Sequence, residues 1–430
     1  MGSASTLRIV VTGLIAQHPS LGGVAWDYVQ YPAGLARLGH DVYYLEDSGQ
    51  WPYRLDGGDT KESRIAYDPT ANVRHLAAVM ERFGLRDRWM YRFPITPRWY
   101  GLPHRRRSDV LATADLLINV SGTLRRPMDY RSIPRFAYID SDPVFTQVRL
   151  QLRHGQRKFQ KRFSAHDVIF SFGERIASTE YADGMDWRPT RQPVLLSEWQ
   201  REEPTRDVFT TVLSWTSYQP LRYRGRWYGQ KDVQLRRYLG IAEAVRPVRL
   251  EIALGGTQHA AWQTHGVKSG SGSTPAEILR RAGWRVADAA SAAGSLERYR
   301  RYVATSKAEW SVAKHGYVAG RSGWFSCRSA CYLAAGRPVV VEDTGFSSVL
   351  PTGEGIVAFS SPEEAADTIR EVTARYGRHA RAARALAAEY FDSDRILTRL
   401  VEEAMSRSRP TPVTDLVETG PGSRTGLTGR

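Results

Sequence analysis

Short apolar runs alternate with segments of helical period from the start of the chain. Residues 7–12 are mostly apolar and β-branched, a pattern typical of a buried strand. A polar loop follows, and apolar positions then recur at helical spacing over residues 24–38. Gly39 and His40 end this predicted helix, and residues 42–45 form the next apolar run. A strand, a helix and a second strand in this order predict a parallel sheet.

The same pattern stops at a proline-rich stretch and then starts again. Residues 188–208 contain three prolines and many charges, which is typical of a connection between domains. Apolar runs that read as strands lie on both sides of it, at 116–120, 136–139, 168–172, 209–215, 250–254, 284–287, 310–313 and 338–342. The sequence therefore predicts an α/β fold with two Rossmann-like, doubly wound domains that face each other across a cleft.

The pattern also sets the expected domain boundaries. We expect a first domain over residues 1–190, a linker over 191–208 and a second domain over 209–385. A final amphipathic helix within 386–409 follows, with Asp392 as its N-cap. Residues 410–430 have few apolar positions and no periodicity, so we expect a disordered tail.

Composition narrows the class of protein. At about 150 residues per domain, 430 residues allow two or three domains, and 42% hydrophobic and 24% charged residues are typical of a soluble globular chain. With only two cysteines and an apolar run at 9–16 that is too short to span a bilayer, we expect a cytoplasmic protein. Cys327 and Cys331 lack further ligands at metal spacing, so no metal site is predicted.

The net charge of +15 makes anionic partners plausible. The chain has 53 Arg and only 7 Lys, however, so much of this charge reflects a bias toward arginine. Basic side chains interleave with apolar ones over residues 148–163, which fits a basic amphipathic helix. That helix could contact an anionic acceptor, a membrane surface or nucleic acid, or simply be a solvated face over a core stripe. A second basic and aromatic stretch, at 86–107, could form an acceptor wall or a loop packed on the core.

Ligands of open parallel sheets bind beyond the carboxyl ends of the strands, so loops after predicted strands are the first candidates. The segment 322–329, which contains Gly and several Ser residues, precedes a predicted helix, and free backbone N–H groups at a helix start favour an anion such as a diphosphate. An ordinary helix start with serine caps is the alternative. Glu342, Asp343, Thr344 and Gly345 follow a later strand and could bind sugar hydroxyls, or form a solvated turn.

Several short segments resemble GT-B glycosyltransferases that use nucleotide-sugar donors. These are Gly22-Gly23 and residues 39–42 early in the chain, the segment Ala334-Ala335-Gly336-Arg337-Pro338-Val339-Val340, which is similar to the family's A-x-G-x-P-V-V pattern, and the following 362–365. The resemblance implies that the first domain binds the acceptor, that the second binds the donor, and that the last helix crosses back to the first domain. Retaining members carry Glu-x7-Glu, but Gly323 and Cys331 stand at those positions, so that mechanism is not supported here.

Many inverting members hold a histidine in the first loop of the N-terminal domain, and His18 occupies such a loop. An imidazole can take the proton of the attacking acceptor group. Asp115 and Asp142 are candidates for orienting it, and Asp142 is the second predicted catalytic residue. A loop histidine without chemistry is the alternative.

The leaving nucleoside diphosphate needs donors that neutralise its charge. Gly229-Gln230-Lys231-Asp232 resembles the lysine-containing phosphate site of many GT-B enzymes, and Lys314 also follows a predicted strand. A surface charge is the alternative for each lysine. The predicted donor-binding residues are Gly22, Gly23, Ser214, Trp215, Thr216, Lys231, Lys314, Ser322, Gly323, Ser326, Arg328, Ser329, Glu342, Asp343, Thr344 and Gly345.

The sequence thus predicts a metal-independent, inverting glycosyltransferase. Its co-substrate is an NDP-sugar, with UDP, dTDP and GDP all open, and no cofactor is expected. The acceptor is a natural-product-like small molecule or an envelope glycan, either of which could be anionic, and the oligomeric state is open. Two rivals remain: a sugar-nucleotide epimerase of the same fold, and a non-catalytic nucleic-acid-binding protein that uses the basic stretches.

Overall fold

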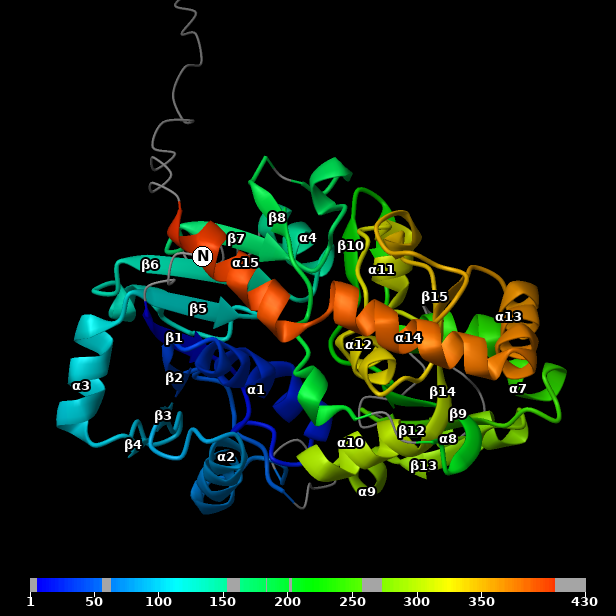
Figure 1. The fold of residues 1–430 in the computed structure, drawn as a ribbon, viewed down its shortest axis with the longest axis horizontal. Coiled ribbons are helices and arrows are strands. Elements are labelled where there is room, and N and C mark those ends of the chain that lie inside the picture. The colour runs from blue at the N-terminus through cyan, green and yellow to red at the C-terminus, as the bar shows by residue number, and fades with distance from the viewer. Residues whose placement is uncertain are drawn as a thin grey trace, which may run out of the picture.

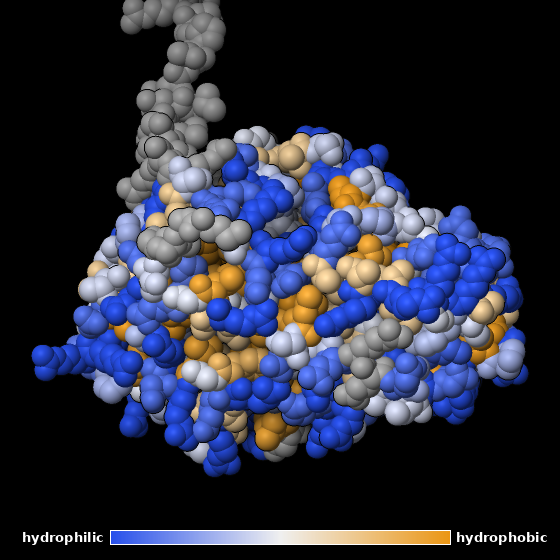
Figure 2. Space-filling model, in the orientation of Figure 1, coloured by the Kyte–Doolittle hydropathy of each residue, from blue (hydrophilic) through white to orange (hydrophobic). Residues whose placement is uncertain are grey.

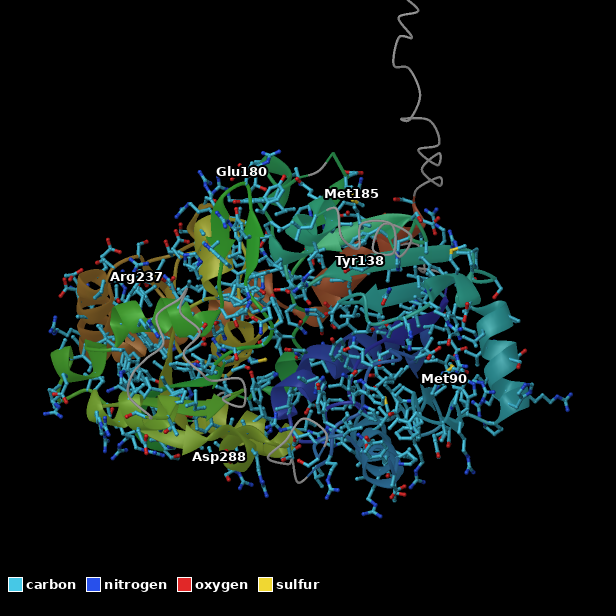
Figure 3. All side chains as sticks on the ribbon, turned by 180° about the vertical axis from the view of Figure 1, so that it is seen from behind. Met90, Tyr138, Glu180, Met185, Arg237 and Asp288 are labelled. Carbon is cyan, nitrogen blue, oxygen red and sulfur yellow. The ribbon has the colours of Figure 1, made fainter. Side chains whose placement is uncertain are left out.

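A computed structural model describes residues 6–55, 63–152, 163–182, 184–200, 203–256 and 273–406. The predicted tail at 410–430 and residues 153–162 of the basic stretch lie outside this range. Figure 1 shows two α/β halves side by side, with the last helices of the chain running across both. Figure 3 gives the view from behind, with Met90 in the first half and Arg237 in the second at opposite ends of the molecule.

The first half is built on an eight-stranded sheet in the order β4-β3-β2-β1-β5-β6-β7-β8. All neighbouring strands are parallel except β3 and β4, and Ile9 on β1 lies between Val42 and Leu116. The strands are β1 (Arg8–Thr12), β2 (Asp41–Glu46), β3 (Trp89–Arg92), β4 (Trp99–Gly101), β5 (Leu116–Val120), β6 (Arg135–Asp140), β7 (Val168–Ser171) and β8 (Trp187–Pro189). Helices α1 (Gly22–Arg37), α2 (Thr70–Arg82), α3 (His104–Thr113) and α4 (Phe145–Gln151) connect them.

The structure decides between two open alternatives and corrects one expectation about this half. The stretch at 86–107 forms strands β3 and β4 with Trp89, Tyr91 and Phe93 buried, which favours the alternative of a segment packed on the core over an acceptor wall. The predicted connection at 188–208 begins inside the sheet, because β8 extends to Pro189. Proline is tolerated there because β8 is an edge strand.

The second half holds a six-stranded sheet in the order β13-β12-β9-β14-β15-β16, with every pair parallel. Its strands are β9 (Arg206–Ser214), β12 (Leu250–Gly255), β13 (Arg285–Asp288), β14 (Ser306–Ser311), β15 (Val339–Glu342) and β16 (Ile356–Phe359). Its helices are α6 (Lys231–Leu235), α7 (Ile241–Ala244), α8 (Pro275–Arg281), α9 (Ala289–Ala293), α10 (Leu296–Thr305), α11 (His315–Gly320), α12 (Cys327–Ala334) and α13 (Pro362–Ala374). A separate hairpin, β10 (Leu221–Tyr223) and β11 (Arg226–Tyr228), was not expected. The prediction of two Rossmann-like parallel domains is confirmed.

The C-terminal helices α14 (Tyr376–Tyr390) and α15 (Ser393–Met405) join the two halves. Asp392 caps α15 as expected, accepting from the N–H of Asp394 at 3.0 Å. Helix α15 packs on α1 so closely that a Cβ at Gly34 would collide with Leu397. A second close contact brings the start of α1 against the turn before α10, where a Cβ at Gly22 would meet the Ser295 carbonyl. The carboxyl ends of the two sheets are thereby held face to face.

Figure 2 shows one side of the molecule as mainly hydrophilic, with apolar residues in small separate patches. Over the described residues, no helix has both the length and the apolar character to cross a bilayer.

Candidate functional site

A cavity of about 390 Å³ lies between the two domains. The first domain contributes the loop after β1, the start of α1, and the residues that follow β5, β6 and β7. The second domain contributes the end of β9 and the starts of α6 and α12. Because both sheets direct the carboxyl ends of their strands to this place, it is where an open α/β sheet binds ligands.

About half of the predicted site residues line this cavity. They are His18, Gly22, Gly23, Ser214, Lys231, Lys314, Ser326 and Arg328. The two glycines also have a packing role, because a Cβ at Gly22 would collide with Ser295 and one at Gly23 would press on the Tyr299 ring. The structure thus brings the first-domain loop and the cationic residues of the second domain together.

The remaining predicted residues lie elsewhere. Trp215 is fully buried in the core of the second domain and does not reach the cavity. Thr216 donates toward the Gly256 carbonyl at 3.4 Å. Ser329, Glu342 and Thr344 line a separate hollow of about 20 Å³, which has room for about one water molecule. Ser322 is buried, and Gly323 adopts a φ of 79° and donates to the Thr344 carbonyl.

The carboxylates expected to bind sugar hydroxyls already have protein partners. Glu342 accepts from Gln234, from the Tyr238 hydroxyl at 3.1 Å and from the Ala313 N–H at 3.2 Å. Burial raises the pKa of Glu342 to about 7 against these hydrogen bonds. Asp343 accepts from the Gly345 N–H at 2.9 Å and from the Ser347 hydroxyl at 3.0 Å, which fixes its own loop. These groups support the loop, and neither carboxylate lines the large cavity.

The start of α12 presents its first turn to the cavity. Ser326 is the N-cap residue, yet its side chain makes no capping hydrogen bond. The first intrahelical bond runs from the Ala330 N–H to the Ser326 carbonyl, so the preceding N–H groups have no partner within the helix. Ser326 and Arg328 both line the cavity. Free N–H groups and the helix dipole make this end a favourable place for an anion.

Lys231 is a basic side chain of the cavity whose charge is not paired with an acidic side chain among the described residues. Its side chain makes no hydrogen bond or ion pair with any residue that the structure describes. Burial lowers the pKa of Lys231 well below its usual range, and the nearby Arg328 and Lys314 lower it further. Arg328, by contrast, pairs with Glu309 at 2.6 Å. An anionic ligand in the cavity would relieve the repulsion at Lys231.

Asp142 connects the two domains through a network of hydrogen bonds. Its carboxylate accepts from Lys314 at 3.0 Å, from the Tyr218 hydroxyl at 2.5 Å and from the Tyr317 hydroxyl, and Arg149 lies 3.8 Å away. Burial would raise the pKa of Asp142, but Lys314 and the two tyrosines outweigh it and the pKa is lowered. Asp142 therefore stays ionised and positions Lys314.

Neither aspartate suggested as a partner of His18 lies beside it. Asp142 has the partners just described, and Asp115 accepts from the backbone N–H of Arg8 at 2.7 Å. The His18 ring nitrogens make no hydrogen bond to a described residue, and the ring stacks on Tyr53 with centroids 5.1 Å apart. Burial lowers the pKa of His18 to about 4, so the imidazole is neutral at physiological pH.

The loop that carries His18 is held by one buried carboxylate. Glu46, at the end of β2, accepts from the N–H groups of Ala16 at 2.8 Å and Gln17 at 2.7 Å, and from the Tyr44 hydroxyl at 2.8 Å. The Tyr44 hydroxyl in turn accepts from the Ile15 N–H. Burial raises the pKa of Glu46 to about 7 against these bonds. Glu46 thus fixes the backbone immediately before His18.

We expect Glu46→Ala to destabilise the protein by about 2–4 kcal/mol, because it leaves three buried donors without an acceptor. The free energy of unfolding in urea measures this. Glu81→Ala is the matched control, since Glu81 is an exposed helix residue and its loss should change stability by less than about 0.5 kcal/mol. Equal stability of the two variants would contradict the role of Glu46.

Asp27, which lines the cavity from α1, is not among the residues predicted from the sequence. Its carboxylate makes no hydrogen bond with any described residue, and burial raises its pKa to about 7, with Arg328 opposing that rise. The available signal was its position, because Asp27 is three residues after Val24 and four before Tyr31 on the apolar face of the helix. An unpartnered carboxyl on a buried helix face that opens into a cavity is a candidate functional group.

The described residues contain no group of three or more His, Cys, Asp or Glu side chains that could hold a metal ion. Charge on a bound anion would instead meet Lys231, Lys314 and the start of α12.

Residues 240–402 match the family described as "Glycosyl transferase-like". No curated protein matches the chain. Among solved structures, HepE of Anabaena in complex with UDP-glucose is 12% identical with a TM-score of 0.55, covering 93% of this chain and 100% of that one. An alpha-glucosyltransferase in complex with UDP and DNA is 12% identical with a TM-score of 0.53, covering 93% and 100%. Sucrose-phosphate synthase of Thermosynechococcus elongatus is 13% identical with a TM-score of 0.50, covering 92% and 98%. At these identities the structures show a common fold.

Proposed function

We propose that this chain, whose fold is that of GT-B glycosyltransferases, transfers a sugar from a nucleoside diphosphate donor to a hydroxyl of a small-molecule acceptor. The transfer inverts the anomeric carbon and needs no metal ion. One observation carries the proposal: a single cavity holds His18 from the first domain and Lys231, Lys314 and the start of α12 from the second. UDP-glucose bound to HepE supports a nucleotide-sugar donor.

The donor diphosphate binds at the start of α12. The free N–H groups of the first turn donate to the phosphate oxygens, and Lys231 supplies a cation that has no partner among the described residues. As the bond between the anomeric carbon and the β-phosphate oxygen breaks, negative charge grows on that phosphate. Fixed hydrogen-bond donors stabilise the transition state, in which this charge has grown, more than they stabilise the ground state. The step is therefore accelerated.

The acceptor hydroxyl attacks the anomeric carbon from the opposite side and loses its proton to His18. The neutral imidazole has an open lone pair, and the charge of a bound diphosphate raises its pKa from about 4 toward the working pH. The same charge raises the pKa of Asp27 above 7, so Asp27 remains protonated. We therefore assign proton acceptance to His18, and to Asp27 a hydrogen bond donated to the donor.

Donor affinity should fall as the pH rises through about 7. Asp27 ionises there in the free protein, and a carboxylate beside the diphosphate repels it, so the Kd of an NDP-sugar should increase about tenfold between about pH 6 and 8. Titration calorimetry of the wild type and of Asp27→Asn measures this, since the amide cannot ionise. A pH dependence of equal slope in both proteins would assign the effect to another group, such as Lys231, and contradict the role of Asp27.

The experiment that tests the proposed function has two steps. A thermal-shift screen with UDP, dTDP and GDP should show stabilisation by at least one of them, because a ligand of the folded state raises the melting temperature. The matching NDP-sugar, incubated with the protein and an alcohol, should then release the nucleoside diphosphate and form a glycoside of inverted configuration. Conversion of the donor to an isomer without acceptor would identify an epimerase, and no shift with any nucleotide would contradict the proposal.

A further inference from the structure

Exposed aromatic side chains lie in the segment that is hydrogen-bonded to the His18 loop. Trp51 is 54% exposed and Tyr67 is 65% exposed, and Tyr53 is also exposed. Tyr53 stacks on His18, and the exposed Leu21 lines the cavity next to it. Exposed rings gain little from folding, so a group of them beside a candidate base indicates a contact with a ligand.

The three rings belong to one short ribbon of backbone. Tyr53 pairs with Ile65, the Arg54 N–H donates to the Arg64 carbonyl at 2.8 Å, and the Ala66 N–H donates to the Pro52 carbonyl at 2.9 Å. This antiparallel register, continued by two residues, places Trp51 opposite Tyr67. We call Trp51, Tyr53 and Tyr67 the aromatic ribbon.

The aromatic ribbon is fixed to the loop that carries His18. The Tyr53 N–H donates to the Gln17 carbonyl at 2.9 Å. The buried Asn72 amide donates to the Ala16 carbonyl at 2.7 Å and to the Tyr53 carbonyl at 2.9 Å, which joins both segments. The distance between the rings and the imidazole is therefore set by backbone hydrogen bonds.

Polar side chains around the aromatic ribbon bind one another and leave little for sugar hydroxyls. Ser48 donates to Gln17 at 3.2 Å, and Gln17 donates to Gln50 at 3.4 Å. Asp47 accepts from the Tyr130 hydroxyl at 2.7 Å. A site for a glycan chain needs several open polar groups beside its aromatic surface, whereas a flat apolar ligand needs mainly the rings.

We propose that the aromatic ribbon binds the acceptor, and that this acceptor is a planar aromatic alcohol whose hydroxyl lies at His18. This inference rests on the proposed function. The acidity of the acceptor supports it, because a phenolic hydroxyl has a pKa of about 10 and gives up its proton far more readily than a sugar hydroxyl. His18 has no carboxylate partner among the described residues, so it is a weak base that suits such an acidic nucleophile. The phenolic oxygen bonds to the anomeric carbon, its proton goes to His18, and the nucleoside diphosphate leaves.

The test uses 4-methylumbelliferone as a planar aromatic alcohol and maltose as a glycan acceptor. Binding of 4-methylumbelliferone, followed by its fluorescence anisotropy, should weaken about tenfold in Trp51→Ala and in Tyr67→Ala. Trp51→Phe should recover most of the affinity. Trp227→Ala is the matched control, since Trp227 is also exposed but lies on β11.

The same variants separate this inference from the proposed function. Thermal shifts by nucleoside diphosphates should be unchanged in all of them, because the exposed rings do not touch the donor region. Equal affinity for 4-methylumbelliferone in the wild type and Trp51→Ala, no binding of it at all, or transfer to maltose alone would overturn the acceptor class. If the wild type binds no nucleoside diphosphate, the proposed function itself is overturned.

Discussion

Lys231→Met should lower kcat by about 100-fold to 1,000-fold, the loss typical when one fixed donor to a developing anion is removed. Lys231 is the cation in the cavity without a partner among the described residues, and its lowered pKa shows that burial and two neighbouring cations oppose its charge. In the proposed mechanism, the bound diphosphate relieves that opposition, most strongly in the transition state. Nucleoside diphosphate release under saturating donor and acceptor measures the effect.

Lys307→Met is the matched control for this variant. Lys307 is a lysine of the same domain that pairs with the exposed Asp207 at 2.7 Å, away from the cavity. Its loss should leave kcat within about twofold, because such surface pairs contribute little. If both variants turn over at the wild-type rate, Lys231 does not serve the leaving group.

His18→Ala should lower kcat by about 100-fold to 10,000-fold while nucleotide binding stays at the wild-type level. The proposed mechanism assigns the acceptor proton to the imidazole and the diphosphate to other residues, so the loss should belong to the chemical step. Steady-state rates and calorimetric Kd values of the nucleoside diphosphate together separate the two effects.

Two further variants make the result specific to His18. His104→Ala removes an exposed histidine at the start of α3 and should leave turnover unchanged. Asp27→Asn should keep measurable turnover, because the proposed mechanism assigns Asp27 to donor binding. Wild-type turnover in His18→Ala together with an inactive Asp27→Asn would transfer the role of base to Asp27.

The sequence was sufficient for the fold class because the buried strands are short, apolar and separated by helical segments. Residues 7–12 and 338–342 contain mainly β-branched or apolar residues, and both lie in parallel sheets as predicted. Three of the strands that were not predicted are edge strands or their neighbours. Strands β3, β4 and β8 mix aromatic, charged and proline residues, and this composition is as typical of a loop as of a half-covered strand.

The candidate site was predictable where chain position decides it and not where side-chain partners decide it. His18, Lys231 and Lys314 follow strands, so topology alone brings them toward the cleft. Glu342 also ends a strand, but Gln234 and Tyr238 occupy its carboxylate, and no pattern in the sequence states those contacts. Asp27 was not predicted because a single acidic residue on a helix points to a site only when the helix face that carries it is known to be buried.

The central claim is that the cavity between the domains holds the donor diphosphate at the start of α12. A crystal structure with the nucleoside diphosphate that gives the largest thermal shift tests it most directly. The account predicts phosphate oxygens within hydrogen-bond distance of the Arg328 backbone N–H and the Lys231 ammonium, with His18 facing the vacant sugar position. A diphosphate bound outside this cavity, or bound in it with Lys231 turned away, would contradict it.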